Sequence, residues 1–249
     1  MGGSDPPMFA SKNMSSKRPQ LANDEIYHLV LRSVGDTRIF NNENDYYRGI
    51  FSIYELNNSN VVDIWLRRQQ RKREKLLEGP TLQNIPQRDL LVEILAFSFM
   101  PNHIHLLVRQ VKNNGVSQFM QKLGTGYAVY FNKKYNRKGH LFNRFRAVHI
   151  KSEEQLRNVF VYIHTNRISI IEPGWKEKGI TNYRRITEFL ENDKWHSYPD
   201  YLGKNNFNSV TSREFLSKIL GGVEGCQQAV DNWVTYKNEF ADFDLIAIE

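Results

Sequence analysis

The sequence of 249 residues is poor in cysteine and has no long apolar run. Its single cysteine, Cys226, excludes an intramolecular disulfide and a cysteine-rich zinc site. No apolar stretch approaches the ~20 residues that a helix needs to cross a bilayer. Residues 1–20 lack the apolar core of a secretory signal, and their Gly, Ser, Pro and Lys content predicts a disordered tail. These absences predict a soluble cytoplasmic protein with no membrane partner.

Aromatic residues and positive charge are better represented. Aromatic side chains make up 12% of the chain, which is too many for a disordered protein, so a folded core is expected. Lys and Arg total 34 against 27 Asp and Glu, which gives a formal charge of +7. The positive balance favours a polyanionic partner, although on a chain of this length it does not identify one.

The spacing of apolar residues predicts an α+β fold. Alternation with a period of two predicts strands at residues 25–33, 90–99, 103–110 and 144–150. Helical spacing predicts helices at residues 45–56, 61–77, 115–135, 152–168 and 212–240, with loops from Glu172 to Gly203. The order of the elements favours a ferredoxin-like antiparallel sheet (βαββαβ) with helices on one face and a C-terminal helical extension.

Two histidines separated by one residue form the first candidate site. His103 and His105 lie at i and i+2 of a predicted strand, so their imidazoles share one face. Such a pair suits two nitrogen ligands of a divalent cation, while Ile104 points into the core. Because His-x-His is common, two structural histidines remain the simpler interpretation of this motif alone.

A tyrosine and an asparagine form the second candidate site. Tyr162 and Asn166 lie at i and i+4 of a predicted helix, which places them on one face with Asn158. Facing the histidine pair, they would supply a nucleophile and a third metal ligand; the alternative is a core tyrosine. Because two amides are costly to bury, we expect this face to line a wet site. His164 should point away from it.

Together these motifs resemble the single-tyrosine HUH transposases, closest to the REP-associated tyrosine transposases and IS200-like proteins. The resemblance rests on FSFMPNHIHLLV, KLGTGYAVYFNKKYNRKGHLFNRFRAVHI, LRNVFVYIHTNRISI and WHSYPDYLG, in this order over residues 21–203. It implies that His103 and His105 are the HUH pair and that Tyr162 is the catalytic tyrosine. It further implies that Asn166 is a third metal contact. Arg167 stands where relatives often carry proline.

The resemblance implies an enzyme that cleaves and rejoins single-stranded DNA near hairpins with Mg²⁺ or Mn²⁺. The tyrosine would become joined to a 5′ phosphate, and the bond energy kept in that ester would make ATP unnecessary. The sequence accordingly has no phosphate-binding loop of the form G-x-x-x-x-G-K-[ST]. Relatives include homodimers and monomers. Two alternatives stay open, a hairpin-binding protein without mobility and a metal-dependent phosphodiesterase that uses water.

The resemblance also divides the chain. The predicted organisation is a tail at 1–20, a catalytic domain at 21–203 and a helical accessory region at 204–249. Basic residues in two stretches are predicted to contact DNA phosphates, although charged runs are often only solvated helix faces. The residues are Arg67, Arg68, Arg71, Lys72 and Arg73 in the first stretch, and Lys133, Lys134, Arg137, Lys138, Arg144 and Arg146 in the second.

Overall fold

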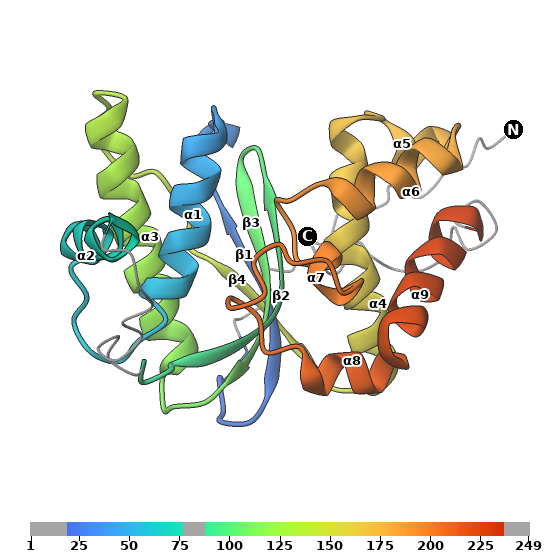
Figure 1. Ribbon diagram of the computed structural model, residues 1–249, viewed down its shortest axis with the longest axis horizontal. Coiled ribbons are helices and arrows are strands. Elements are labelled where there is room, and N and C mark those ends of the chain that lie inside the picture. Colours follow the sequence, from blue (N-terminus) through green and yellow to red (C-terminus); the bar gives the residue numbers. More distant parts are fainter. Residues whose placement is uncertain (1–18, 77–87, 237–249) are drawn as a thin grey trace, which may run out of the picture.

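A four-stranded antiparallel sheet forms the centre of the computed structural model, which describes residues 19–76 and 88–236 (Figure 1). The strands are β1 (Ile26–Arg32), β2 (Val92–Met100), β3 (His103–Gln110) and β4 (Arg146–Ile150), in the order β2-β3-β1-β4. Every neighbouring pair is antiparallel. All four predicted strands are therefore confirmed, and so is the predicted antiparallel α+β architecture.

The helices between the strands cover one face of the sheet, as predicted. These are α1 (Glu43–Glu55), α2 (Ile64–Leu76) and α3 (Gly115–Lys134). The helix α1 begins at a capping box, in which Asn42 and Asp45 each accept a hydrogen bond from the other's backbone amide. Between α1, α3 and the sheet lies a core of fully buried side chains that includes Phe97, Ile104 and Phe119.

A second layer of helices covers the opposite face of the sheet. The sequence predicts helices on one face only, so this layer is a difference from the prediction. Its members are α4 (Glu153–Thr165), a 3-10 segment (Asn166–Ile170), α5 (Trp175–Lys178), α6 (Tyr183–Asn192), α7 (Tyr198–Tyr201), α8 (Glu214–Leu220) and α9 (Gly222–Tyr236). Figure 1 shows α4 and α9 on the side of the sheet away from α1 and α3. Leu95 and Leu107 turn toward this layer and explain why it packs there.

Three predicted elements differ from the structure. The helix α4 ends at Thr165 and continues as a 3-10 segment, whereas one helix was predicted to residue 168. The predicted loop after Glu172 contains α5, α6 and α7. The last helical region is broken at Gly221 and Gly222, whose φ angles of 91° and 78° lie in the left-handed region that favours glycine.

The C-terminal helices pack into the second layer. Side chains of α8 and α9 that are buried against it include Leu216, Leu220 and Cys226. The division at residue 204 stays a prediction. Residues 1–18 of the predicted tail, Leu77 and residues 237–240 of two predicted helices lie outside the described residues. Within the described ranges, no helix is long and apolar enough to cross a membrane.

Candidate functional site

The histidine pair lies on β3, and its two rings face the second helical layer. Ile104, between them, is fully buried in the first core, as predicted. The ring atoms Nε2 of His103 and Nε2 of His105 are 2.9 Å apart. Pairing with β1 places Arg32 opposite His103 and Val30 opposite His105. The two imidazoles therefore present the same nitrogen toward one point.

A chain of hydrogen bonds fixes the ring of His103. The Asn102 amide nitrogen donates to Asp36 Oδ1 over 3.2 Å, and Arg32 Nε donates to the same oxygen over 2.7 Å. The hydrogen bond from Arg32 holds the pKa of Asp36 below its usual value, so this carboxylate is ionised at neutral pH. Asn102 Oδ1 is then left to accept from His103 Nδ1, 2.6 Å away. When the His103 ring is neutral, this arrangement leaves a lone pair on its Nε2.

A third histidine, which the sequence analysis missed, lies behind His105. His28 on β1 places its Nε2 2.9 Å from His105 Nδ1. Burial lowers the pKa of His28 to about 3 and the pKa of His105 well below its usual value, so both rings are neutral at neutral pH. When His105 Nδ1 donates to His28, the Nε2 of His105 also keeps a lone pair.

Asn166 brings an amide to the same point from the other layer. It is buried at the start of the 3-10 segment, and its Nδ2 lies 2.9 Å from His105 Nε2. A 180° turn of the amide places its oxygen there instead. Among the described residues, no group of three or more His, Cys, Asp or Glu side chains is arranged to hold a metal. Two imidazoles and one amide therefore make up the candidate ligand set.

Arg167 anchors the segment that carries Asn166. Its buried guanidinium donates to the Asp193 carboxylate and to the Phe99 carbonyl oxygen at the end of β2. Burial nevertheless raises the pKa of Asp193, against the opposing effect of the Arg167 charge. Arg167 thus ties the 3-10 segment to the sheet.

Tyr162 lies beneath the histidines and is only 3% exposed. Its ring meets the rings of His28 and His105 edge to face, with centroid separations of 5.9 and 5.6 Å. The Lys176 Nζ lies 5.8 Å from the centre of the tyrosine ring. The expected wet face is found only in part, because Asn166 lines the cavity beside the histidines while Tyr162 is buried and Asn158 does not line that cavity. Packing of α4 against the sheet buries Tyr162, which the helical spacing alone does not predict.

Other tyrosines and histidines have different surroundings. Tyr127 donates to the Ile39 carbonyl oxygen and Tyr130 donates to Asp45, both on the opposite side of the sheet. His164 points away from the site, as predicted, and its Nε2 lies 2.8 Å from Ser197 Oγ. Tyr162 is therefore the tyrosine of α4 that meets the histidine pair.

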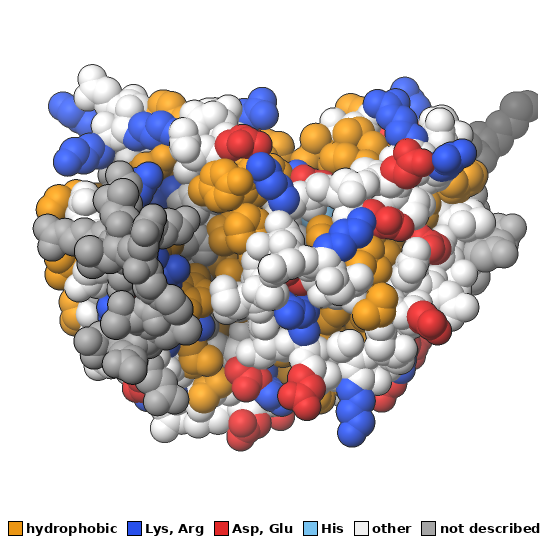
Figure 2. Space-filling model, in the orientation of Figure 1, with side chains coloured by type: hydrophobic (Ala, Val, Ile, Leu, Met, Phe, Trp, Pro, Cys, Tyr) orange, Lys and Arg blue, Asp and Glu red, His pale blue; other side chains and the backbone are white. Residues whose placement is uncertain are grey.

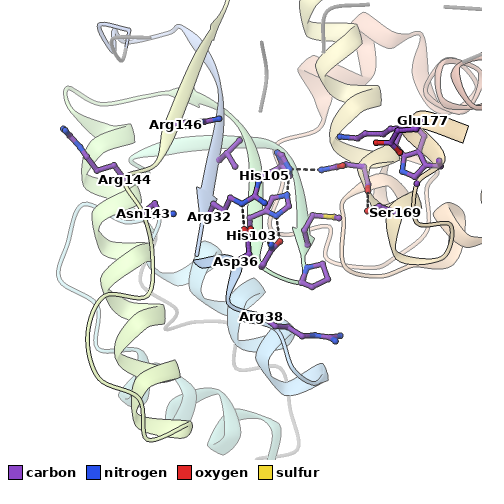
Figure 3. Close-up of a pocket in the computed structure, with 18 residues that line it drawn as sticks. Arg32, Asp36, Arg38, His103, His105, Asn143, Arg144, Arg146, Ser169 and Glu177 are labelled. Carbon is purple, nitrogen blue, oxygen red and sulfur yellow. Dashed lines mark hydrogen bonds and ion pairs between the residues drawn. The ribbon is translucent and has the colours of Figure 1, made fainter. Parts of the chain in front are cut away.

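A cavity of about 850 Å³ opens beside the histidines (Figure 3). Figure 3 shows His103 and His105 on its sheet side, and Ser169 and Glu177 on the side of the second helical layer. Five cationic side chains line it against two acidic ones, so the cavity attracts anions. The cations are Arg32, Arg38, Arg144, Arg146 and Lys176, and the acids are Asp36 and Glu177.

Only two of the predicted DNA-contacting residues, Arg144 and Arg146, line this cavity. Lys134 is paired with Asp45 over 2.6 Å, and Arg71 is paired with Glu55 over 2.7 Å. The remaining predicted residues with described side chains do not line it either: they are Arg67, Arg68, Lys133, Arg137 and Lys138. The side chains of Lys72 and Arg73 lie outside the described residues.

Residues 64–166 match the family model described as Transposase IS200 like. Over this segment the chain is similar to IS200-like transposases. This segment runs from the first residue of α2 to Asn166, so it contains both histidines of β3 and Tyr162. The resemblance seen in the sequence is thereby confirmed.

Solved structures give weaker matches to this chain. One, titled as a REP-associated tyrosine transposase bound to a REP hairpin, is 13% identical, with a TM-score of 0.44, over 78% of this chain and 88% of that one. A bacterial tRNA(His) guanylyltransferase-like protein in complex with ATP is 11% identical, with a TM-score of 0.36, over 71% of each chain. Neither likeness is close enough to carry an argument. No curated protein matches the chain.

Proposed function

We propose that the protein cleaves and rejoins single-stranded DNA with Tyr162 as nucleophile and a divalent cation at His103, His105 and Asn166. The observation that supports this most is the convergence of two Nε2 atoms and one amide on a single point, with the Tyr162 ring directly behind. This convergence lies inside the IS200-like segment.

The residues present fit a cation at this point. When both rings are neutral, their hydrogen-bond partners favour tautomers with a lone pair on each Nε2, and these two atoms, 2.9 Å apart, could then bind one cation as neighbouring ligands. Imidazole and amide-oxygen donors suit Mn²⁺, and Mg²⁺ accepts such oxygen ligands with water completing its shell. When bound, the cation would polarise a nonbridging phosphate oxygen and orient the phosphodiester.

The Tyr162 side chain would form the covalent bond to DNA. The Oη of Tyr162 forms a bond to phosphorus as the bond from phosphorus to O3′ breaks, and the phenol proton ends on the released 3′ hydroxyl. The DNA 5′ phosphate is then held as a tyrosine ester. Because Tyr162 does not line the cavity, the attack requires a rearrangement that brings its Oη to the phosphate. The cavity cations, including Arg32 and Lys176, would hold the phosphate meanwhile.

The burial of Tyr162 supports a second candidate. A metal-dependent phosphodiesterase that uses water would need the histidine pair and the cationic cavity but no exposed tyrosine. The two candidates differ in their product. Attack by Tyr162 leaves protein joined to one DNA fragment, whereas attack by water releases both fragments of the cleaved strand free.

The finer features of the proposal follow the family resemblance. We propose hairpin-containing single-stranded DNA as the substrate, in a chain that acts as a monomer or as a homodimer. We further propose residues 21–203 as the catalytic domain and residues 204–249 as an accessory helical region.

The test is incubation of the protein with a library of single-stranded hairpin oligonucleotides and Mn²⁺, followed by a denaturing gel. We expect a covalent adduct with wild type and none with Tyr162→Phe, which removes only the hydroxyl. Tyr130→Phe is the matched control, since Tyr130 lies on the opposite side of the sheet, and it should form the adduct. Cleavage without any adduct in wild type would support the water-dependent phosphodiesterase instead. An adduct mapped to another tyrosine in Tyr162→Phe contradicts the assignment.

A further inference from the structure

A second cavity lies on the face of the molecule that carries α1 and α2, and the histidine site has no part in it. Its volume is about 430 Å³, and it is enclosed by α1, α2 and the chain at residues 207–210. Four aromatic rings line it: Tyr47, Phe51, Tyr54 and Phe207. Figure 2 shows hydrophobic side chains exposed along α1 on this face, with Lys and Arg side chains beside them. We call this cavity the aromatic groove.

Among the residues that the structure describes, the lining of the aromatic groove contains positive charge and no acidic side chain. Three arginines line it, Arg48, Arg68 and Arg71, and none of the described lining residues is Asp or Glu. Glu55 pairs with Arg71 from outside the groove over 2.7 Å, so two arginines remain without an acidic partner in the lining. An anion in the groove would therefore be favoured.

The surroundings of Arg48 strengthen this point. Its Nε is buried and has no hydrogen-bond partner among the described residues. Burial lowers the pKa of Arg48, and the nearby positive charge of Arg68 lowers it further. Because both arginines line the same groove, their like charges repel, and a bound anion would relieve the repulsion.

The aromatic rings indicate which anion fits. Tyr47 is 44% exposed, and its ring lies near those of Trp195 and Phe207, with centroid separations of 5.0 and 6.2 Å. Exposed rings beside arginines are the combination with which proteins bind single-stranded nucleic acid, since bases stack on the rings and phosphates meet the cations. Arg71 already lies over the rings of Phe51 and Tyr54, but an inorganic anion would make no use of the exposed ring of Tyr47, whereas a base can stack on it.

We propose that the aromatic groove binds one unpaired nucleotide of a DNA strand, with its base against Tyr47 or Phe207 and its phosphate at Arg48 and Arg68. This inference rests on the proposed function, because it assumes that the chain binds single-stranded DNA. One strand can reach both sites. Arg38 lines the histidine cavity and Asn44 lines the groove, and six residues of chain span at most about 20 Å.

The inference is tested by crosslinking the full chain to an oligothymidylate of about 12 nucleotides that contains 5-iodouracil, a length within the range of single-strand sites. Mass spectrometry should place the crosslink on Tyr47, Phe51, Tyr54 or Phe207. A hairpin oligonucleotide with Mn²⁺ is assayed for the covalent adduct in parallel. If the adduct forms but the crosslinks map outside the groove, the groove inference is wrong and the proposed function stands. A crosslink in the groove without any adduct supports the groove and contradicts the proposed function, and failure of both overturns both.

Affinity measurements by fluorescence anisotropy give a second readout. Tyr47→Leu, which keeps an apolar side chain, should weaken binding roughly 5- to 150-fold, the loss of one stacked base. Arg68→Gln should lower the salt slope by ~0.7, the loss of one phosphate contact. Tyr183→Leu and Arg184→Gln are matched controls on α6, where both side chains are exposed.

Equal losses in the groove variants and the α6 controls would overturn the inference. A competition arm separates a strand from a free nucleotide. Thymidine monophosphate should displace the oligonucleotide only at far higher concentration than the unlabelled oligonucleotide does. Equal potency of the two competitors would overturn the assignment to a DNA strand.

Discussion

Replacing His28 by leucine should weaken metal binding and leave the fold nearly as stable. The change removes the acceptor of His105 Nδ1, and a buried donor without a partner costs about 1–3 kcal/mol. It also removes His28 Nδ1, which is itself buried with no hydrogen-bond partner among the described residues. The two effects have similar size and opposite sign, so the free energy of unfolding should change by about 1 kcal/mol or less.

The affinity for Mn²⁺ has no such compensation. Without His28, nothing holds the Nδ1 proton of His105, so the tautomer that presents a lone pair at Nε2 loses its preference. Loss of such a partner behind a ligand typically costs 10- to 100-fold in affinity. We expect a loss of this size in His28→Leu by isothermal titration calorimetry, and a smaller one in His28→Gln, which keeps an acceptor.

His149→Leu serves as the control for the His28 variants. His149 is half-buried on β4, pairs with Glu25 over 2.7 Å, and stacks on Tyr27 in the first core. It should change Mn²⁺ affinity little. Wild-type affinity in His28→Leu, measured with an unchanged unfolding midpoint in urea, would refute the reasoning that His28 sets the tautomer of His105.

Three further predictions concern stability and reactivity. Acid should unfold the metal-free protein well above pH 3, because four buried histidines with lowered pKa stay neutral in the folded chain and protonate in the unfolded chain. Each histidine's contribution to the free energy of unfolding is fully present above pH ~6.5 and falls by up to ~1.4 kcal/mol for each pH unit below it. Circular dichroism during an acid titration measures this unfolding. The four histidines are His28, His105, His164 and His196. Arg167→Met should cost about 3–5 kcal/mol in urea unfolding, since it leaves the Asp193 carboxyl buried alone, and adding Asp193→Leu should recover most of this. Cys226 is buried and its pKa is raised to about 11, so a thiol reagent should react with it only as the chain unfolds; rapid reaction in the native state would contradict this.

Much of the fold could be predicted because period and caps are local signals. The strand β3 was predicted with its observed bounds, and α3 to within one residue. The helix α6 was missed, although Ile186 and Leu190 show helical spacing and Asn182 caps its first turn. Its ten residues carry few apolar side chains. The covering of the second face by α4 and the helices after it depends on contacts between distant segments, which local spacing does not contain.

The site divides in the same way. His103 and His105 were predicted to share a face because two positions of one strand have a fixed relation. His28 lies in a predicted strand in which alternate residues share a face. Its contact with His105 depends on the pairing of β1 with β3, which the spacing within one strand does not show. Arg38 and Lys176 reach the cavity through tertiary structure alone. The burial of Tyr162 was mispredicted because a helical face shows which residues lie together, and not what packs over them.

The candidate ligands come from two layers of the molecule, and this has a thermodynamic consequence. His103 and His105 belong to the sheet, while Asn166 belongs to the layer that packs on it. A cation bound by all three would act as a crosslink across that seam, and at a hundred times its Kd it would add about 2.7 kcal/mol to the free energy of unfolding. Tyr162 is buried in the same seam, so as the proposed nucleophile it would have to leave the seam to react. Metal occupancy would thus oppose the release of the nucleophile, and we expect DNA to bind most productively when it widens the seam.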